Sequence, residues 1–293
     1  MKANPLLGVA LMTVAMMLLP LGDGIAKYLT GATSYGSGFL AWSRFVVGVA
    51  TVVPFACLTR AFAGLGWRFA YQQAIRGALV AGAIGMIITA LESIPLADAF
   101  GAFFIGPALA TVLAALVLRE RVTRIEWVAV ALGFLGVLLV VRPSGDMSVG
   151  LLWALAGGSS YGGFLVATRW ATNSGPAAAQ LAGQLCFGLL ILAPFGARDL
   201  VTHGIEAPGM LLLMGAISVT SNLLSILALA RARAAFLAPV VYVQIISATA
   251  YSWLIFDQIV DTIAFLGLML IIAAGISRIP FGMLFAQKVP HNG

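Results

Sequence analysis

The chain has 293 residues, of which 61% are hydrophobic and only 9% are charged, and its formal net charge is +6. A soluble domain carries about 25% charged residues, so this composition excludes a water-soluble globular fold and predicts a polytopic membrane protein. The Lys and Arg residues stand singly or in pairs at the ends of apolar runs. That distribution is typical of topogenic signals and argues against a nucleic-acid partner.

Apolar runs bounded by charges or by Gly and Pro clusters predict ten membrane-spanning helices. A helix of about 20 apolar residues spans about 30 Å, the thickness of the hydrocarbon core of a lipid bilayer. We therefore expect an all-α integral membrane protein embedded in the lipid bilayer. The predicted spans cover residues 5–25, 37–58, 71–91, 96–118, 125–141, 148–168, 177–196, 208–230, 236–256 and 261–279.

Residues 92–143 show the pattern most clearly. Twenty uncharged residues (99–118) precede a charged hinge at 119–126, and fifteen more uncharged residues (127–141) follow it. The hinge carries five charges, which favours a turn at the membrane surface. Pro107 lies in the middle of the first of these spans, where it removes one backbone hydrogen bond and is expected to kink the helix.

The distribution of basic residues predicts the orientation of the chain. If the N-terminus is inside, twelve Lys and Arg residues lie on the inner side and three on the outer side. The positive-inside rule then places both termini in the cytoplasm.

The two halves of the chain show a weak internal repeat. Gly8 and Lys27 bracket the first span at a separation of nineteen residues, and Gly150 and Arg169 bracket the sixth span at the same separation. Five spans per repeat is an odd number, so the second copy must be inverted relative to the first. We expect two inverted five-helix repeats, residues 1–145 and 146–293, the second with a short cytoplasmic tail, as in secondary transporters.

Several sequence motifs carry a family resemblance. They read P-L-A-D-A and L-R-E-R-V-T-R-I-E-W-V-A-V-A-L-G-F-L-G-V-L-L-V-V-R-P in the first half, with L-G-D-G-I-A-K-Y-L in the first span and F-L-A-W-S-R-F in the second. Together they resemble the EamA repeat of the drug/metabolite transporter superfamily, most closely the YddG-type amino-acid exporters of bacterial inner membranes. The resemblance implies a ten-helix exporter of small metabolites, including amino acids.

The sequence lacks the catalytic residues and motifs that an enzyme would need. The two histidines, His203 and His291, lie in a loop and in the tail, and the sequence shows no Walker A loop, no haem motif and no paired-acid motif for a metal-bound diphosphate. Cys57 and Cys186 have no second metal ligand at a suitable spacing. We expect neither catalysis nor a cofactor, and no metal site.

A carrier needs polar groups near the middle of the bilayer, and the eighth span offers the clearest set. Four of its polar residues follow i, i+3, i+4, i+7 spacing, so they share one helix face. This face is predicted to line a substrate cavity, although hydrogen bonding to a neighbouring helix is the alternative. The predicted substrate-binding residues are Ser160, Tyr161, Ser218, Ser221, Asn222, Ser225, Tyr242, Gln244, Phe103 and Phe104.

Helix-breaking residues at matching positions of the two halves predict a gate or hinge. The candidates are Pro20 and Gly22 in the first span and Gly162 and Gly163 in the sixth. Close helix packing by small residues is the alternative reading of these glycines.

Charged residues in the apolar runs bear on energy coupling. Glu92, Asp98 and Asp23 are expected near the outer ends of their spans, in reach of water, and Arg44 is expected to extend its side chain outward. Glu92 and Asp98 are the best candidates if transport is coupled to protons.

The leading functional hypothesis is alternating-access export of amino acids, possibly aromatic or hydrophobic ones, and related small metabolites across the bacterial inner membrane. A passive channel or facilitator for small polar solutes is the alternative, but it would favour a continuous polar stripe or rings of charge.

Overall fold

The computed structural model describes residues 5–119, 123–141, 148–171, 174–229, 231 and 238–276. The first half contains six α-helices: α1 (Pro5–Ala32), α2 (Ser37–Leu58), α3 (Trp67–Leu91), α4 (Leu96–Phe103), α5 (Ile105–Val117) and α6 (Arg124–Val141). The second half contains α7 (Val149–Trp170), α8 (Ala177–His203), α9 (Pro208–Leu229), the 3-10 helix η1 (Ala238–Tyr242), α11 (Val243–Phe256) and α12 (Thr262–Ile276).

The helices have the length and composition of membrane spans. Within the described ranges, seven are long and apolar enough to cross a bilayer, counting α4 and α5 together, and three shorter apolar helices cover 127–140, 240–256 and 262–274. Each of these ten segments overlaps one of the ten predicted spans, although α8 runs to His203, seven residues beyond its predicted end at 196. The chain is thus an all-helical, multi-pass membrane protein.

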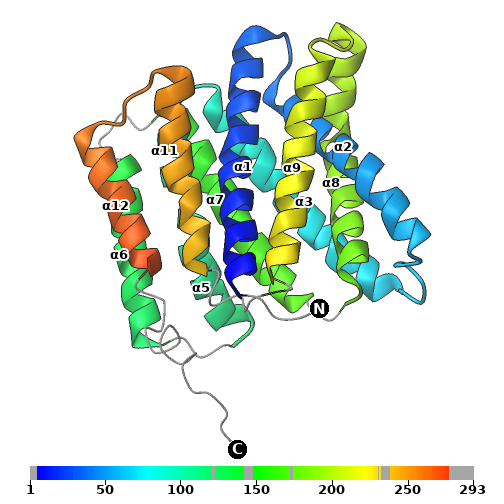
Figure 1. Ribbon diagram of the computed structural model, residues 1–293, viewed down its shortest axis with the longest axis horizontal. Coiled ribbons are helices and arrows are strands. Elements are labelled where there is room, and N and C mark those ends of the chain that lie inside the picture. Colours follow the sequence, from blue (N-terminus) through cyan, green and yellow to red (C-terminus); the bar gives the residue numbers. More distant parts are fainter. Residues whose placement is uncertain are drawn as a thin grey trace, which may run out of the picture.

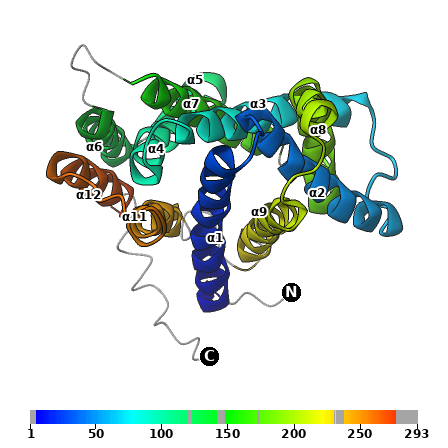
Figure 2. The ribbon, with the colours of Figure 1, turned by 90° about the horizontal axis from the view of Figure 1, so that it is seen from above.

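The helices run in alternating directions through one slab (Figure 1). The start of α1 and the end of α12 lie on the same side, at the bottom of the view. Seen from above, α6 and α12 form one end of the assembly and α2 and α8 the other, with α1, α9 and α11 on one side between them (Figure 2).

The most extensive helix contacts join the two halves of the chain. They are made between α3 and α7, α2 and α8, α1 and α9, and α6 and α12. The spans of the two halves correspond in chain order, so α1 corresponds to α7, α2 to α8 and α3 to α9. Exchanging each helix for its counterpart converts the α1–α9 pair into the α7–α3 pair. The same exchange leaves the α2–α8 and α6–α12 pairs unchanged. This packing is the arrangement of two inverted five-helix repeats.

Pro20 lies inside α1 without ending it. Proline has no N–H, so the carbonyl of Met16, four residues earlier, loses its helical donor. Ser247 Oγ on α11 lies 3.3 Å from the Met16 carbonyl oxygen, but it is closer to the Val243 and Gln244 carbonyl oxygens of its own helix, at 2.9 and 3.1 Å. Helix α1 nevertheless continues to Ala32, seven residues beyond the predicted end of the first span, which corrects that boundary.

Pro107 has the predicted effect on the fourth span. The carbonyl of Phe103 loses its partner four residues on, α4 ends at Phe103, and α5 begins at Ile105. The ninth span is also interrupted, because η1 precedes α11 where one continuous helix was expected.

Candidate substrate-binding site

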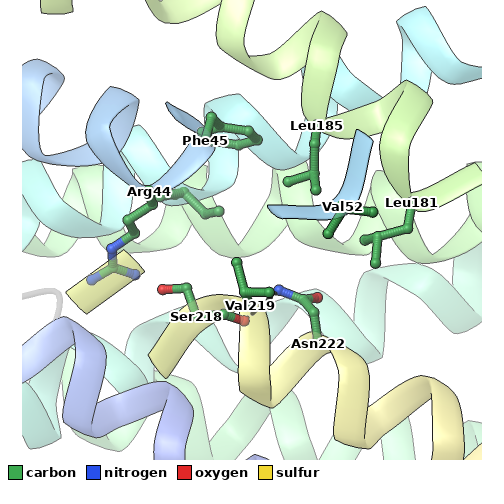
Figure 3. Close-up of a pocket in the computed structure, with 9 residues that line it drawn as sticks. Arg44, Phe45, Val52, Leu181, Leu185, Ser218, Val219 and Asn222 are labelled. Atoms are coloured by element: carbon green, nitrogen blue, oxygen red, sulfur yellow. Dashed lines mark hydrogen bonds between the residues drawn. The ribbon is translucent and has the colours of Figure 1, made fainter. Parts of the chain in front are cut away.

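A pocket of about 340 Å³, its open mouth included, lies among α2, α3, α8 and α9 (Figure 3). Arg44, Ser218 and Asn222 supply its polar groups. Ser218 is ten residues into α9, about 15 Å along the helix axis, so the pocket is deep within the spans. The rest of the lining is apolar and consists of Phe45, Val52, Ile84, Leu181, Leu185 and Val219.

The guanidinium of Arg44 forms a buried ion pair. Its Nη1 lies 2.5 Å from Asp23 Oδ1, and the two side chains are only 4% and 7% exposed. Its Nη2 donates to the carbonyl of Gly22 at 2.7 Å, whereas its buried Nε has no hydrogen-bond partner among the described residues. The expected outward extension of Arg44 and the expected hydration of Asp23 are therefore wrong.

The extended α1 explains this correction. Because the helix runs on to Ala32, Asp23 lies nine residues before its end, about 13 Å inside. The signal available in the sequence was a pair of opposite charges in two successive apolar runs, neither of which could remain unpaired in lipid.

The polar face of α9 divides between the pocket and the helix interface. Ser218 and Asn222 line the pocket, and within the described part of the chain Asn222 Nδ2 donates only to the Ser218 carbonyl of its own helix, at 2.9 Å. Ser221 is fully buried and donates to the Ala15 carbonyl of α1 at 2.8 Å, so it joins two helices. Ser225 is half-buried and bonds to the Ser221 carbonyl of its own helix.

The predicted aromatic residues form a cluster outside the pocket lining. The rings of Phe103 and Tyr161 lie 5.3 Å apart between α4 and α7, and those of Phe104, at the break between α4 and α5, and Tyr242 of η1 lie 5.4 Å apart. These pairs pack the interrupted spans against their neighbours.

Two further predicted substrate-binding residues also lie away from this pocket. Ser160 Oγ donates to the Leu79 carbonyl of α3 at 2.8 Å, and Gln244 is buried in α11.

The glycines of α7 differ in what surrounds them. A Cβ on Gly158 would meet the carbonyl oxygen of Phe103 at less than van der Waals distance, and one on Gly162 would lie 2.6 Å from the Gly106 oxygen. This contact with the Gly106 backbone explains the glycine at position 162 by close helix packing, which was the alternative to a hinge. A Cβ on Gly163 would meet only the Leu79 side chain, at 3.2 Å, so a hinge there stays a prediction.

The gate candidates of α1 are buried within the bundle. Pro20 is buried within the bundle, like the Met16 carbonyl that lacks its helical donor. A Cβ on Gly22 would lie 3.4 Å from Ile217 and 3.7 Å from Ser218 on α9. Gly22 thus lies where α1 meets the wall of the pocket.

Neither coupling candidate lines the pocket. Glu92 is exposed, and its Oε1 accepts a hydrogen bond from the Ser37 amide at the start of α2, at 3.1 Å. Asp98 is half-buried in the first turn of α4 and acts electrostatically on Lys27.

The Lys27 ammonium donates to the carbonyls of Leu91 and Ile94 at 2.8 and 2.6 Å. The sequence alone did not indicate this link between α1 and the end of α3.

The model of the EamA-like transporter family matches the chain twice, over residues 6–142 and 148–276. The chain belongs to the EamA-like transporter family. This membership agrees with the inverted five-helix repeats and identifies the protein as a membrane transporter. It also supports the expectation that the protein is not an enzyme.

Curated relatives of this EamA-like transporter include the pseudopaline exporter CntI of Pseudomonas aeruginosa PAO1. It is 24% identical over 244 residues, which cover 80% of this chain and 83% of the relative. The CntI protein of strain UCBPP-PA14 matches to the same extent. A crystal structure of another protein superposes with a TM-score of 0.62 at 16% identity, covering 96% of this chain and 98% of that one, and shows the shared fold.

Proposed function

We propose that this EamA-like transporter exports amino acids and related small metabolites across the bacterial inner membrane by alternating access. The observation that supports this proposal is the pocket at Arg44. One cation, one hydroxyl and one carboxamide stand beside an apolar wall, which is the composition that a small molecule with a charged head and an apolar side chain requires.

The relatives agree with export but do not specify this substrate. CntI is a pseudopaline exporter, and the present chain shares 24% of its residues over the aligned region. Amino acids are proposed here from the lining of the pocket together with the resemblance of the sequence motifs.

The proposed orientation follows from the charge distribution, which places both termini in the cytoplasm. The two halves, residues 1–145 and 146–293, would then act as inverted repeats around the pocket. An exporter in this orientation receives substrate from the side that carries the charged 119–126 hinge.

Counterflow in proteoliposomes tests the function. Vesicles loaded with an unlabelled apolar amino acid should accumulate the labelled form transiently, with saturable kinetics. Uptake that is linear in concentration and shows no counterflow would indicate a passive channel. The absence of uptake for every amino acid would overturn the proposed substrate class.

A further inference from the structure

The ion pair at the pocket is buried but incompletely satisfied. Arg44 has five N–H groups, and the structure records bonds from Nη1 to Asp23 and from Nη2 to the Gly22 carbonyl, while Nε has no partner among the described residues. Such a donor, buried and unpaired, is costly unless a ligand can complete it. Arg44 also belongs to the pocket lining, so part of its side chain borders the pocket although its guanidinium is buried.

Asp23 and Arg44 hold opposite charges in contact, with Arg44 in the pocket lining and Asp23 on α1 outside it. A buried ion pair contributes little net stability, because desolvation offsets most of the attraction between the charges. It can therefore open at modest cost if a second ion pair takes its place. A zwitterion offers that replacement, since it brings one anion and one cation and leaves no buried charge unpaired.

We propose that the Asp23–Arg44 pair is the receptor for the α-carboxylate and α-ammonium groups of the substrate. The substrate inserts between the two side chains, its carboxylate against the Arg44 guanidinium and its ammonium against the Asp23 carboxylate. Planar guanidinium groups bind carboxylates through two parallel hydrogen bonds, which would use the free Nε. Without substrate, Arg44 takes the place of the ammonium group beside Asp23, and Asp23 takes the place of the carboxylate beside Arg44.

The rest of the pocket then sets the side-chain preference. Ser218 and Asn222 lie on the α9 wall next to Arg44, and among the described residues both side chains donate only to their own helix backbone, which leaves hydrogen-bonding capacity for a ligand (Figure 3). Phe45, Val52 and Leu185 face them across the pocket. This geometry assigns apolar α-amino acids as the substrate class and so rests on the proposed function above.

Matched analogues of two amino acids test the receptor in the detergent-purified full chain. One series is L-phenylalanine, L-phenylalaninamide, 3-phenylpropanoate and phenethylamine; the other is L-leucine, L-leucinamide, 4-methylpentanoate and isopentylamine. Wild-type protein should bind the amino acid at least about tenfold more tightly than any analogue that lacks one charge, the lower end of the coupling measured for close charge pairs. Equal affinity for phenylalanine and its amide would overturn the proposal.

Charge-removing variants assign each group. Arg44→Gln should abolish the preference for phenylalanine over its amide, and Asp23→Asn should abolish the preference over 3-phenylpropanoate. If either single variant fails to fold, the neutral Asp23→Asn/Arg44→Gln double variant should bind all four ligands with equal, weak affinity. A variant protein that keeps the wild-type ratios would contradict the assignment.

A second buried arginine provides the control. Arg76 on α3 lies outside the pocket and bonds to Gln73 at 2.6 Å and to Gln180 at 3.1 Å. Arg76→Gln should lower stability while leaving the ratios between analogues unchanged. Counterflow of amino acids without any discrimination between analogues would overturn this inference alone. Binding that discriminates through Arg44, without counterflow of any amino acid, would overturn the proposed function alone.

Discussion

Two adjacent glycines of α7 should respond oppositely to the same substitution. In Gly162→Ala the new Cβ would lie 2.6 Å from the Gly106 carbonyl oxygen, where ordinary contact begins at 3.4 Å. The helix α7 must therefore move at least the difference, 0.8 Å, away from α5. In Gly163→Ala the Cβ would meet a methyl group of Leu79 at 3.2 Å, and a flexible side chain can yield by that amount.

The magnitudes follow from two opposing effects. Overpacking costs about 1–3 kcal/mol, and contact with fixed backbone places Gly162→Ala at the upper end, whereas replacing Gly by Ala in a helix contributes about 1 kcal/mol. The net expectation is a loss of about 2 kcal/mol for Gly162→Ala. For Gly163→Ala the helix preference dominates, and we expect a gain of up to about 1 kcal/mol.

Thermal unfolding in detergent, combined with counterflow, measures both effects. A difference of about 3 kcal/mol corresponds to a Tm difference of about 6–12 °C in a chain of this order of size. Gly162→Ala should have the lower Tm, and its transport per folded molecule should stay near wild type. A Gly162→Ala protein with unchanged Tm but reduced maximal rate would refute the packing argument and restore the hinge.

Three further predictions concern the pocket wall and the topology. Asn222→Ala should impair transport while the Tm stays near wild type, because Asn222 bonds only within its own helix; a protein that unfolds but still transports would show that Asn222 holds a neighbouring helix. Ser221→Ala should do the reverse, with about 1 kcal/mol lost in unfolding measurements as the bond to Ala15 disappears, and a transport defect at unchanged Tm would contradict this. Reporter fusions should place the 142–150 loop outside and the 119–126 loop inside; detection of both on one side would exclude the inverted arrangement.

The number and order of the spans could be predicted from the sequence because lipid leaves a helix few alternatives. Twenty uncharged residues must form a spanning helix, and Pro107 must interrupt its own hydrogen-bond ladder. The ends of the helices were harder to predict from the sequence. Pro20 was interpreted as the outer break of the first span, but α1 continues through it to Ala32 and packs against α9 and α11, contacts that only the tertiary structure provides.

The candidate site was predicted only in part for a related reason. Helical spacing predicted one polar face on α9, yet it could not distinguish Asn222, which lines the pocket, from Ser221, which contacts α1. That distinction depends on where α1 crosses α9. The Asp23–Arg44 pair was missed because the depth of Asp23 depended on the true end of α1, so one boundary error displaced a charged residue by about two turns.

The contacts between the helices limit which parts of this transporter can move. The four most extensive interfaces each join a helix of the N-terminal half to one of the C-terminal half. A motion of one half against the other would break all four at once. We therefore expect mixed pairs, such as α1 with α9 and α3 with α7, to move as units. The sequence repeat would then differ from the moving unit, and a hinge is better sought between these pairs than in the connection at residues 142–147 that joins the repeats.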